Sequence, residues 1–205
     1  MDLERLEREL KKRLDYPYRW GRKQSDSWDR DTNFIYKTYS FRRLLERINN
    51  LDPDVRDYAL NRWYNYWSAM GAEYIFSSQG RVTPNKNVYD KLVDFTIQRI
   101  PFDHKTSVFP RGFEQSIGYA INHKKELIEW LYNNQSQQGR KHLKNRMFIV
   151  LYDSSGQHWK MKSEIELIKQ SIEGYMTKFS EENLIKIAVN SEVILSDIIW
   201  IIKND

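Results

Sequence analysis

The chain has 205 residues, a formal net charge of +5 and no cysteine. Without cysteine, disulfide scaffolds, cysteine-bound zinc, iron–sulfur clusters and thiol catalysis are excluded. An aromatic content of 14% argues against a disordered chain, and the mild basic excess permits a polyanionic partner without requiring one.

The first 80 residues have the periodicity of helices. Leucines at positions 3, 6, 10 and 14 form one stripe, which predicts a charged amphipathic helix over residues 1–15. Residues 16–33 contain many loop-forming residues, and apolar spacing then predicts a helix from about residue 40 to 49. Asp52-Pro53 is a helix start, and this helix is expected to end near Gly80.

After Gly80 the period changes to that of strands and helices in alternation. We expect strands at Val82, 93–97 and 100–107, a helix over 113–133, a polar loop over 135–145, a doubly buried strand over 147–152, a helix over 163–179, and strands over 184–189 and 198–202. This order predicts an α/β fold around one mixed β-sheet flanked by helices. We expect residues 1–53 to form a helical N-terminal extension packed on a core of residues 54–205.

No segment of the sequence has the length and apolarity of a membrane span. The N-terminus, Met1 to Arg8, is charged and unlike a signal peptide, and the apolar run 198–202 has only the length of a strand. We therefore expect a cytoplasmic protein with no membrane partner.

Several common catalytic motifs are missing. The sequence lacks the glycine-rich phosphate loops of dinucleotide and P-loop proteins and the Gly-x-Ser-x-Gly elbow. None of the four histidines is spaced from another as metal ligands usually are. Dinucleotide chemistry, P-loop chemistry and serine-hydrolase chemistry therefore have no support.

One stretch, Val93 to Ser107, carries residues suited to metal chemistry. Asp103 and Lys105 are two apart on an expected strand and so project to the same face, while His104 points away. Asp94, on the preceding strand, can approach the same point if the two strands pair. Two carboxylates suit a hard divalent ion, and a lysine nearby can orient water or neutralise charge. The alternative is a surface salt bridge between Asp103 and Lys105.

This stretch and the elements around it resemble the PD-(D/E)XK nuclease superfamily, which has the restriction-endonuclease-like fold. That family places a first acid at the second strand, as Asp94 here, and an acid-x-Lys on the third, as Asp103-His104-Lys105. Many members have a glutamate on the preceding helix, and Glu73 in Met70-Gly-Ala-Glu73 matches it. Two departures are Val93 where the family usually has proline and Asp103 where glutamate is commoner; Asp90 is the fallback for Asp94.

The resemblance implies a metal-dependent DNA endonuclease of the restriction type that uses Mg²⁺ or Mn²⁺ and can form a homodimer. The implied catalytic residues are Asp94, Asp103, Lys105 and Glu73, with Asp94, Asp103, Glu73 and the backbone carbonyl of His104 as metal ligands. Expected DNA contacts near the motif are Lys91, Arg99, Arg111 and Gln115. Arg19, Arg22 and Lys23, among aromatic residues, are further expected contacts, although such aromatics can equally anchor a loop.

Two other functions are left open by the sequence. A non-catalytic nucleic-acid-binding or assembly protein could keep the same fold. A protein-interaction module that displays the helical N-terminal third is the weaker alternative.

Overall fold

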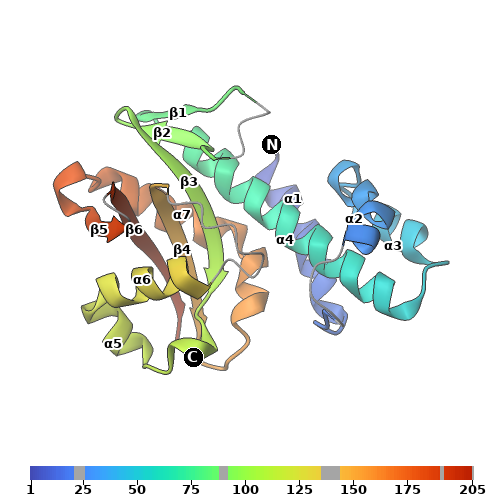
Figure 1. The fold of residues 1–205 in the computed structure, drawn as a ribbon. Coiled ribbons are helices and arrows are strands. Elements are labelled where there is room, and N and C mark those ends of the chain that lie inside the picture. Colours follow the sequence, from blue (N-terminus) through green and yellow to red (C-terminus); the bar gives the residue numbers. More distant parts are fainter. Residues whose placement is uncertain (21–25, 88–91, 135–143, 190–191, 205) are drawn as a thin grey trace. The chain divides into compact units, whose positions relative to one another are not determined.

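The computed structural model describes residues 1–20, 26–87, 92–134, 144–189 and 192–204 (Figure 1). Its contacts divide the chain into two compact units. The N-terminal unit comprises residues 1–72 and 162–166, and the C-terminal unit comprises residues 73–161 and 167–205.

The N-terminal unit is helical, as the periodicity predicts. Its elements are α1 (Leu3–Lys11), a 3-10 helix (Lys12–Asp15), α2 (Asp26–Asp31), a second 3-10 helix (Asn33–Lys37), α3 (Phe41–Ile48) and most of α4 (Pro53–Ser77). The expected helices over 1–15, 40–49 and from Pro53 are confirmed, whereas the expected loop over 16–33 contains α2.

Helix α4 explains why the units divide at residue 72 and not at residue 53. From Tyr58 to Tyr64 every side chain of α4 is buried, so the N-terminal segment surrounds the helix instead of covering one stripe of it. Gly71 allows α1 to approach closely, because a Cβ atom there would lie 2.7 Å from Leu6 Cδ2. The first five turns of α4 therefore belong to the N-terminal core.

The C-terminal unit is built on a mixed β-sheet. Its six strands in the described residues are β1 (Val82–Pro84), β2 (Phe95–Ile97), β3 (Ile100–Val108), β4 (Arg146–Asp153), β5 (Ile185–Val189) and β6 (Glu192–Lys203), in the spatial order β1-β2-β3-β4-β6-β5. β3, β4 and β6 are parallel, and the other pairs are antiparallel. The predicted α/β class with one mixed sheet is confirmed.

Helices cover both faces of this sheet (Figure 1). α6 (Lys124–Asn134) packs on one face through Leu127, Ile128 and Leu131, and α5 (Ile117–Asn122) joins it through Ala120. α7 (Ile165–Thr177) lies on the other face. Met147 to Leu151 of β4 are fully buried, as expected for a strand covered on both sides. Further 3-10 helices are Arg111–Phe113, His158–Ser163 and Glu181–Asn183.

The prediction of one helix over residues 113–133 is wrong. Glu114 has a left-handed backbone with φ of 56°, and the Ser116 side chain then caps α5 by accepting from the backbone N–H of Tyr119 at 3.1 Å. At His123 the backbone leaves helical geometry (φ −122°, ψ 47°), which separates α5 from α6. The apolar period continues across this break, so periodicity alone could not reveal it.

None of the described helices is both long and apolar enough to cross a membrane.

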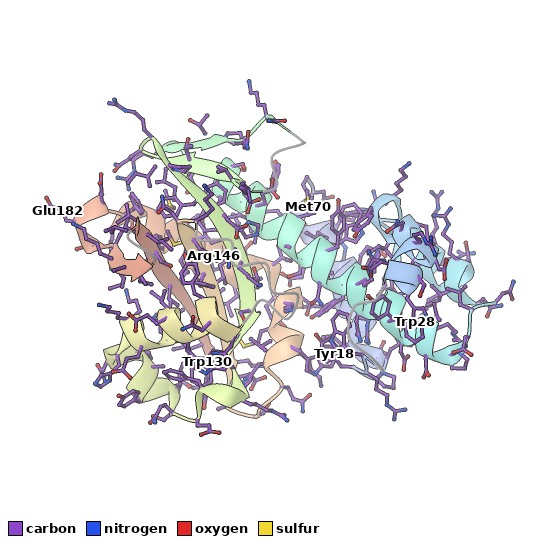
Figure 2. All side chains as sticks on the ribbon, in the orientation of Figure 1. Tyr18, Trp28, Met70, Trp130, Arg146 and Glu182 are labelled. Atoms are coloured by element: carbon purple, nitrogen blue, oxygen red, sulfur yellow. The ribbon has the colours of Figure 1, made fainter. Side chains whose placement is uncertain are left out.

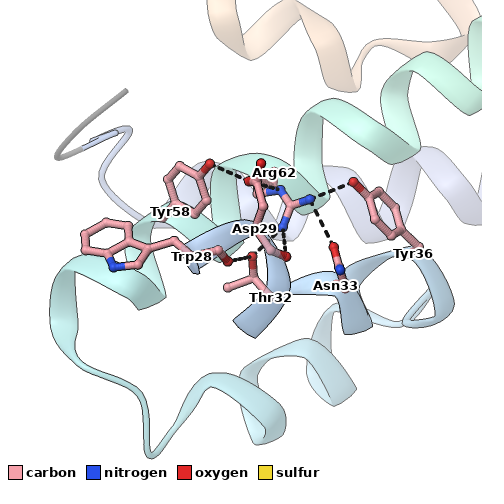
Figure 3. Close-up of polar contacts among 7 residues, drawn as sticks. All are labelled: Trp28, Asp29, Thr32, Asn33, Tyr36, Tyr58 and Arg62. Atoms are coloured by element: carbon pink, nitrogen blue, oxygen red, sulfur yellow. Dashed lines mark hydrogen bonds and ion pairs between the residues drawn. The ribbon is translucent and has the colours of Figure 1, made fainter. Parts of the chain in front are cut away.

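A buried arginine ties the segments of the N-terminal unit together (Figure 3). Arg62 of α4, 7% exposed, donates to Tyr36 Oη at 2.6 Å, to Thr32 Oγ1 at 2.5 Å and to the backbone oxygen of Asp29 at 2.8 Å. Its Nε also lies 3.3 Å from Asp29 Oδ1, which accepts from Tyr58 Oη. These contacts join α2 and the following 3-10 helix to α4.

We predict that Arg62→Ala lowers the free energy of unfolding of the N-terminal unit by about 3 kcal/mol, because it leaves buried acceptors and a carboxylate without their partner. Urea denaturation followed by tryptophan fluorescence measures the change. Arg8→Ala, which removes an exposed ion pair to Glu4, is the control and should cost less than about 0.5 kcal/mol. Equal effects of the two substitutions would contradict the structural role of Arg62.

Candidate metal and catalytic site

The site begins where strands β2 and β3 part. The last β2–β3 pair is Phe95, the first residue of β2, opposite Phe102. Asp94, just before β2, still donates its backbone N–H to Phe102 O at 2.9 Å. The next N–H of β3 on that side is that of His104, and Asp94 Oδ2 accepts from it at 2.8 Å. The Asp94 side chain thus takes the place of a further strand residue.

A short turn gives Asp94 this position. Gln98 and Arg99 both have positive φ (49° and 72°) and form a two-residue turn between Ile97 and Ile100. In a strand, successive residues form backbone hydrogen bonds to opposite sides. Phe102 bonds toward β2, so an N–H at position 101 would point toward β4. Because the pairing with β4 starts only at Asp103, proline at position 101 costs no hydrogen bond.

Asp94 also holds the imidazole of His104. Asp94 Oδ2 lies 2.7 Å from His104 Nδ1, and the His104 side chain is 5% exposed. Since a carboxylate only accepts, Nδ1 carries the hydrogen of this bond, and a neutral imidazole then keeps a lone pair on Nε2. His104 Nε2 is buried and has no hydrogen-bond partner. A buried nitrogen without a partner is costly unless something else, such as a metal ion, binds it.

Glu73 completes a group of three potential ligands. It comes from the C-terminal end of α4, and one ligand atom each from Glu73, Asp94 and His104 lie within 4.8 Å of one another. The family resemblance implies Glu73 and Asp94 as ligands. For His104 it implies the backbone carbonyl and not the side chain. The imidazole, on the face of β3 opposite Asp103, was missed because no second histidine stands at ligand spacing.

Electrostatics within this group favour charge on Asp94. Burial raises the pKa of Glu73, and the Asp94 carboxylate raises it further. Burial also acts to raise the pKa of Asp94, but the hydrogen bonds from His104 outweigh it and leave that pKa lowered. Although burial alone would lower the pKa of His104, its bond to Asp94 and the neighbouring carboxylates raise it. Positive charge is therefore stabilised among these three residues, either as the protonated imidazole of His104 or as a bound ion that takes the place of its proton.

Asp103 and Lys105 lie on the other face of β3, as the strand alternation predicts. Asp103 stands opposite Arg146 of β4, and its Oδ2 lies 2.5 Å from both Nε and Nη2 of Arg146 (Figure 2 labels Arg146). Burial raises the pKa of Asp103 against the opposing effect of Arg146, and Asp94 raises it further. Arg146 was missed because the sequence does not give the register between β3 and β4.

Lys105 is a half-buried amine beside this ion pair. Burial lowers its pKa, the Arg146 guanidinium lowers it further, and only Asp103 opposes them. The carboxyl groups of Asp94 and Asp103 also influence each other's pKa: Asp103 acts to lower that of Asp94, and Asp94 raises that of Asp103. The site thus consists of two groups of residues: Asp94 with Glu73 and His104, and Asp103 with Arg146 and Lys105. The carboxyl groups of Asp94 and Asp103 connect the two groups.

The expected DNA contacts are distributed unevenly. Arg99, Arg111 and Gln115 are exposed, but Arg111 follows the far end of β3, roughly 17 Å of strand from Asp103. Arg111 begins the three-residue 3-10 helix Arg111–Phe113, and α5 starts only at Ile117. Arg19 is exposed, and its neighbour Trp20 packs edge-on against Tyr58, which favours anchoring of this segment. The fallback acid and three expected contacts lie outside the described residues: Asp90, Lys91, Arg22 and Lys23.

The donor set fits a divalent ion that accepts both oxygen and imidazole nitrogen, such as Mn²⁺ or Zn²⁺, better than Mg²⁺ alone. We predict that the chain binds Mn²⁺ and that His104→Ala weakens this binding by at least about 10-fold, the lower end of what even an indirect partner of a ligand contributes. Isothermal titration calorimetry measures the affinity. His123→Ala is the matched control, since His123 is exposed and outside this group; equal Mn²⁺ affinity in both variants would contradict the ligand role of His104.

Comparisons of this chain with models of protein families, with curated proteins and with solved structures give no match.

Proposed function

We propose that this chain is a metal-dependent nuclease that hydrolyses phosphodiester bonds of DNA, with a restriction-endonuclease-like C-terminal unit. The observation that carries the proposal is the group of Glu73, Asp94 and His104 beside β3, with His104 on one face of that strand and Asp103 and Lys105 on the other. The order of elements, α4, the strands β1 to β3, helices and then β4, supports it, since the resembling family has the same order.

If the ion binds Nε2 of His104, Glu73 would be its carboxylate ligand and Asp94 would orient the imidazole, because Nε2 points away from the Nδ1 that Asp94 engages. If it binds Asp94 instead, Glu73 and the backbone carbonyl of His104 would complete the site. Asp103 would be a further carboxylate. A bound Mg²⁺ or Mn²⁺ would polarise the phosphodiester and lower the pKa of a water molecule. Asp94 is held in its ionised form by His104, so it is ready to bind a cation without first losing a proton.

Lys105 suits a role in handling water or developing charge. Its lowered pKa brings the amine closer to giving and taking a proton near neutral pH, and its charge is partly shielded from solvent. Asp103 tethers it electrostatically, and Arg146 fixes Asp103. These residues can orient a water molecule and stabilise negative charge on a leaving oxygen.

A second function is supported by one contact. Asp103, which the family resemblance makes a metal ligand, has its carboxylate engaged by Arg146 at 2.5 Å. A strong ion pair competes with metal binding at the same oxygen. A nucleic-acid-binding protein that keeps the fold without cleavage is therefore the alternative.

We predict that the purified chain nicks or cleaves plasmid DNA with Mg²⁺ or Mn²⁺ and that EDTA stops the reaction. Lys105→Ala and Asp94→Asn should each lower the rate by about 100-fold or more, the usual cost of removing one group that stabilises transition-state charge. Gel electrophoresis of the plasmid over time measures the rate.

Lys125→Ala, an exposed lysine of α6, is the matched control and should cleave like the original chain. Metal titration adds a second test: Lys105→Ala should keep Mn²⁺ affinity while Asp94→Asn loses it. DNA binding without any metal-dependent cleavage would favour the non-catalytic alternative, and cleavage that survives all substitutions would overturn the proposal.

A further inference from the structure

The N-terminal unit contains a second candidate site, a cationic pocket of about 690 Å³. Residues of α1, of the segment 37–40 and of α3 line it. Four of the lining side chains are cationic and exposed, while a single one is a carboxylate, Glu46. The four cations are Arg5, Lys37, Arg43 and Arg47.

The positive charge of this cationic pocket is not cancelled within the protein. Glu46 is engaged from outside the lining by Arg42, whose Nε lies 3.2 Å from Glu46 Oε1. Within the described part of the chain, none of the four lining cations lies within 4 Å of a carboxylate oxygen. Anions are therefore attracted to the pocket.

Two of the arginines are positioned by neighbouring groups. Arg47 Nη1 donates to Thr38 Oγ1 at 3.1 Å, and its guanidinium stands 5.2 Å from the centre of the Phe34 ring. The Arg5 guanidinium stands 5.3 Å from the centre of the Tyr39 ring. Contacts with rings and a hydroxyl orient each guanidinium without neutralising it, so further N–H donors remain for a ligand.

The backbone beneath the pocket is firmly held. The carbonyl of Thr38, 4% exposed, accepts from the indole N–H groups of Trp63 at 2.6 Å and Trp67 at 3.0 Å. At the start of α3, Glu9 accepts from the backbone N–H of Phe41 at 2.6 Å. A pocket fixed in this way can bind without a large cost in ordering its own walls.

We propose that this cationic pocket binds phosphate groups of a nucleic-acid strand. Four cations exceed the charge of one phosphate dianion, so several phosphates of a polyanion match the pocket better than one small ion does. Arginine suits the geometry of phosphate oxygens, and such contacts bind the backbone without reading sequence. The choice of nucleic acid over another source of phosphate rests on the proposed function, whereas the charge and shape of the pocket do not.

The test measures binding of a fluorescent DNA duplex to the full chain by anisotropy, in EDTA so that no cleavage occurs. Lys37→Glu and Arg43→Glu should each raise Kd on the order of 10-fold, and each neutral Ala variant should reduce the slope of log affinity against log salt by about 1. Arg30→Glu is the matched control: Arg30 is exposed on α2 of the same unit, outside the lining, and carries the same change of charge. Circular dichroism checks that each variant is folded.

Equal weakening by all three Glu variants would mean that only overall charge matters, and this would overturn the site. Release of the duplex by millimolar inorganic phosphate or a mononucleotide, at matched ionic strength, would overturn a nucleic-acid strand as the occupant. Failure of the proposed function has a different signature: the plasmid stays intact with Mg²⁺ or Mn²⁺, while duplex binding remains sensitive to Lys37 and Arg43.

Discussion

The hydrogen bond from the His104 backbone N–H to the Asp94 carboxylate, 2.8 Å long, is the contact on which the candidate site depends. It exists because β2 is only three residues long and begins at Phe95, opposite Phe102. No residue of β2 therefore lies opposite His104 to accept from its N–H. A backbone donor buried at that point must be satisfied, and the side chain of Asp94 does so. The same oxygen then orients the imidazole, so a single carboxylate fixes both the strand edge and a ligand.

This arrangement divides the chemistry between the faces of β3. One face presents Glu73 and His104, and the other presents Lys105 with the Asp103–Arg146 ion pair. Strand alternation makes this division unavoidable for three successive residues. Asp94 stands at the edge between the faces and interacts with both His104 and Asp103. In the proposed nuclease, an ion and the Lys105 amine would therefore meet one phosphate only near that edge, beyond the last β2–β3 pair.

Local patterns in the sequence predicted the types of most elements, the mixed sheet and the shared face of Asp103 and Lys105. They failed where a contact far along the chain decides the outcome. The partner of Asp103 depends on the register with Arg146, which is 43 residues away. The position of the His104 imidazole depends on where β2 begins, and a strand of three residues does not reveal this in the sequence. The break at His123 depends on one residue within a continuous apolar period.

The two units would have opposite effects on a polyanionic substrate: the carboxylates of the C-terminal unit repel it, and the cations of the N-terminal unit attract it. Three carboxylates, Glu73, Asp94 and Asp103, repel phosphate unless a cation is bound among them, so attraction has to come from elsewhere on the chain. At physiological salt, charge is screened over about 8 Å, so the exposed cations of the N-terminal pocket would attract phosphates mainly at short range. If both proposals hold, binding and metal-dependent chemistry use separate residues, so substitutions in the pocket and in the site would give distinguishable results.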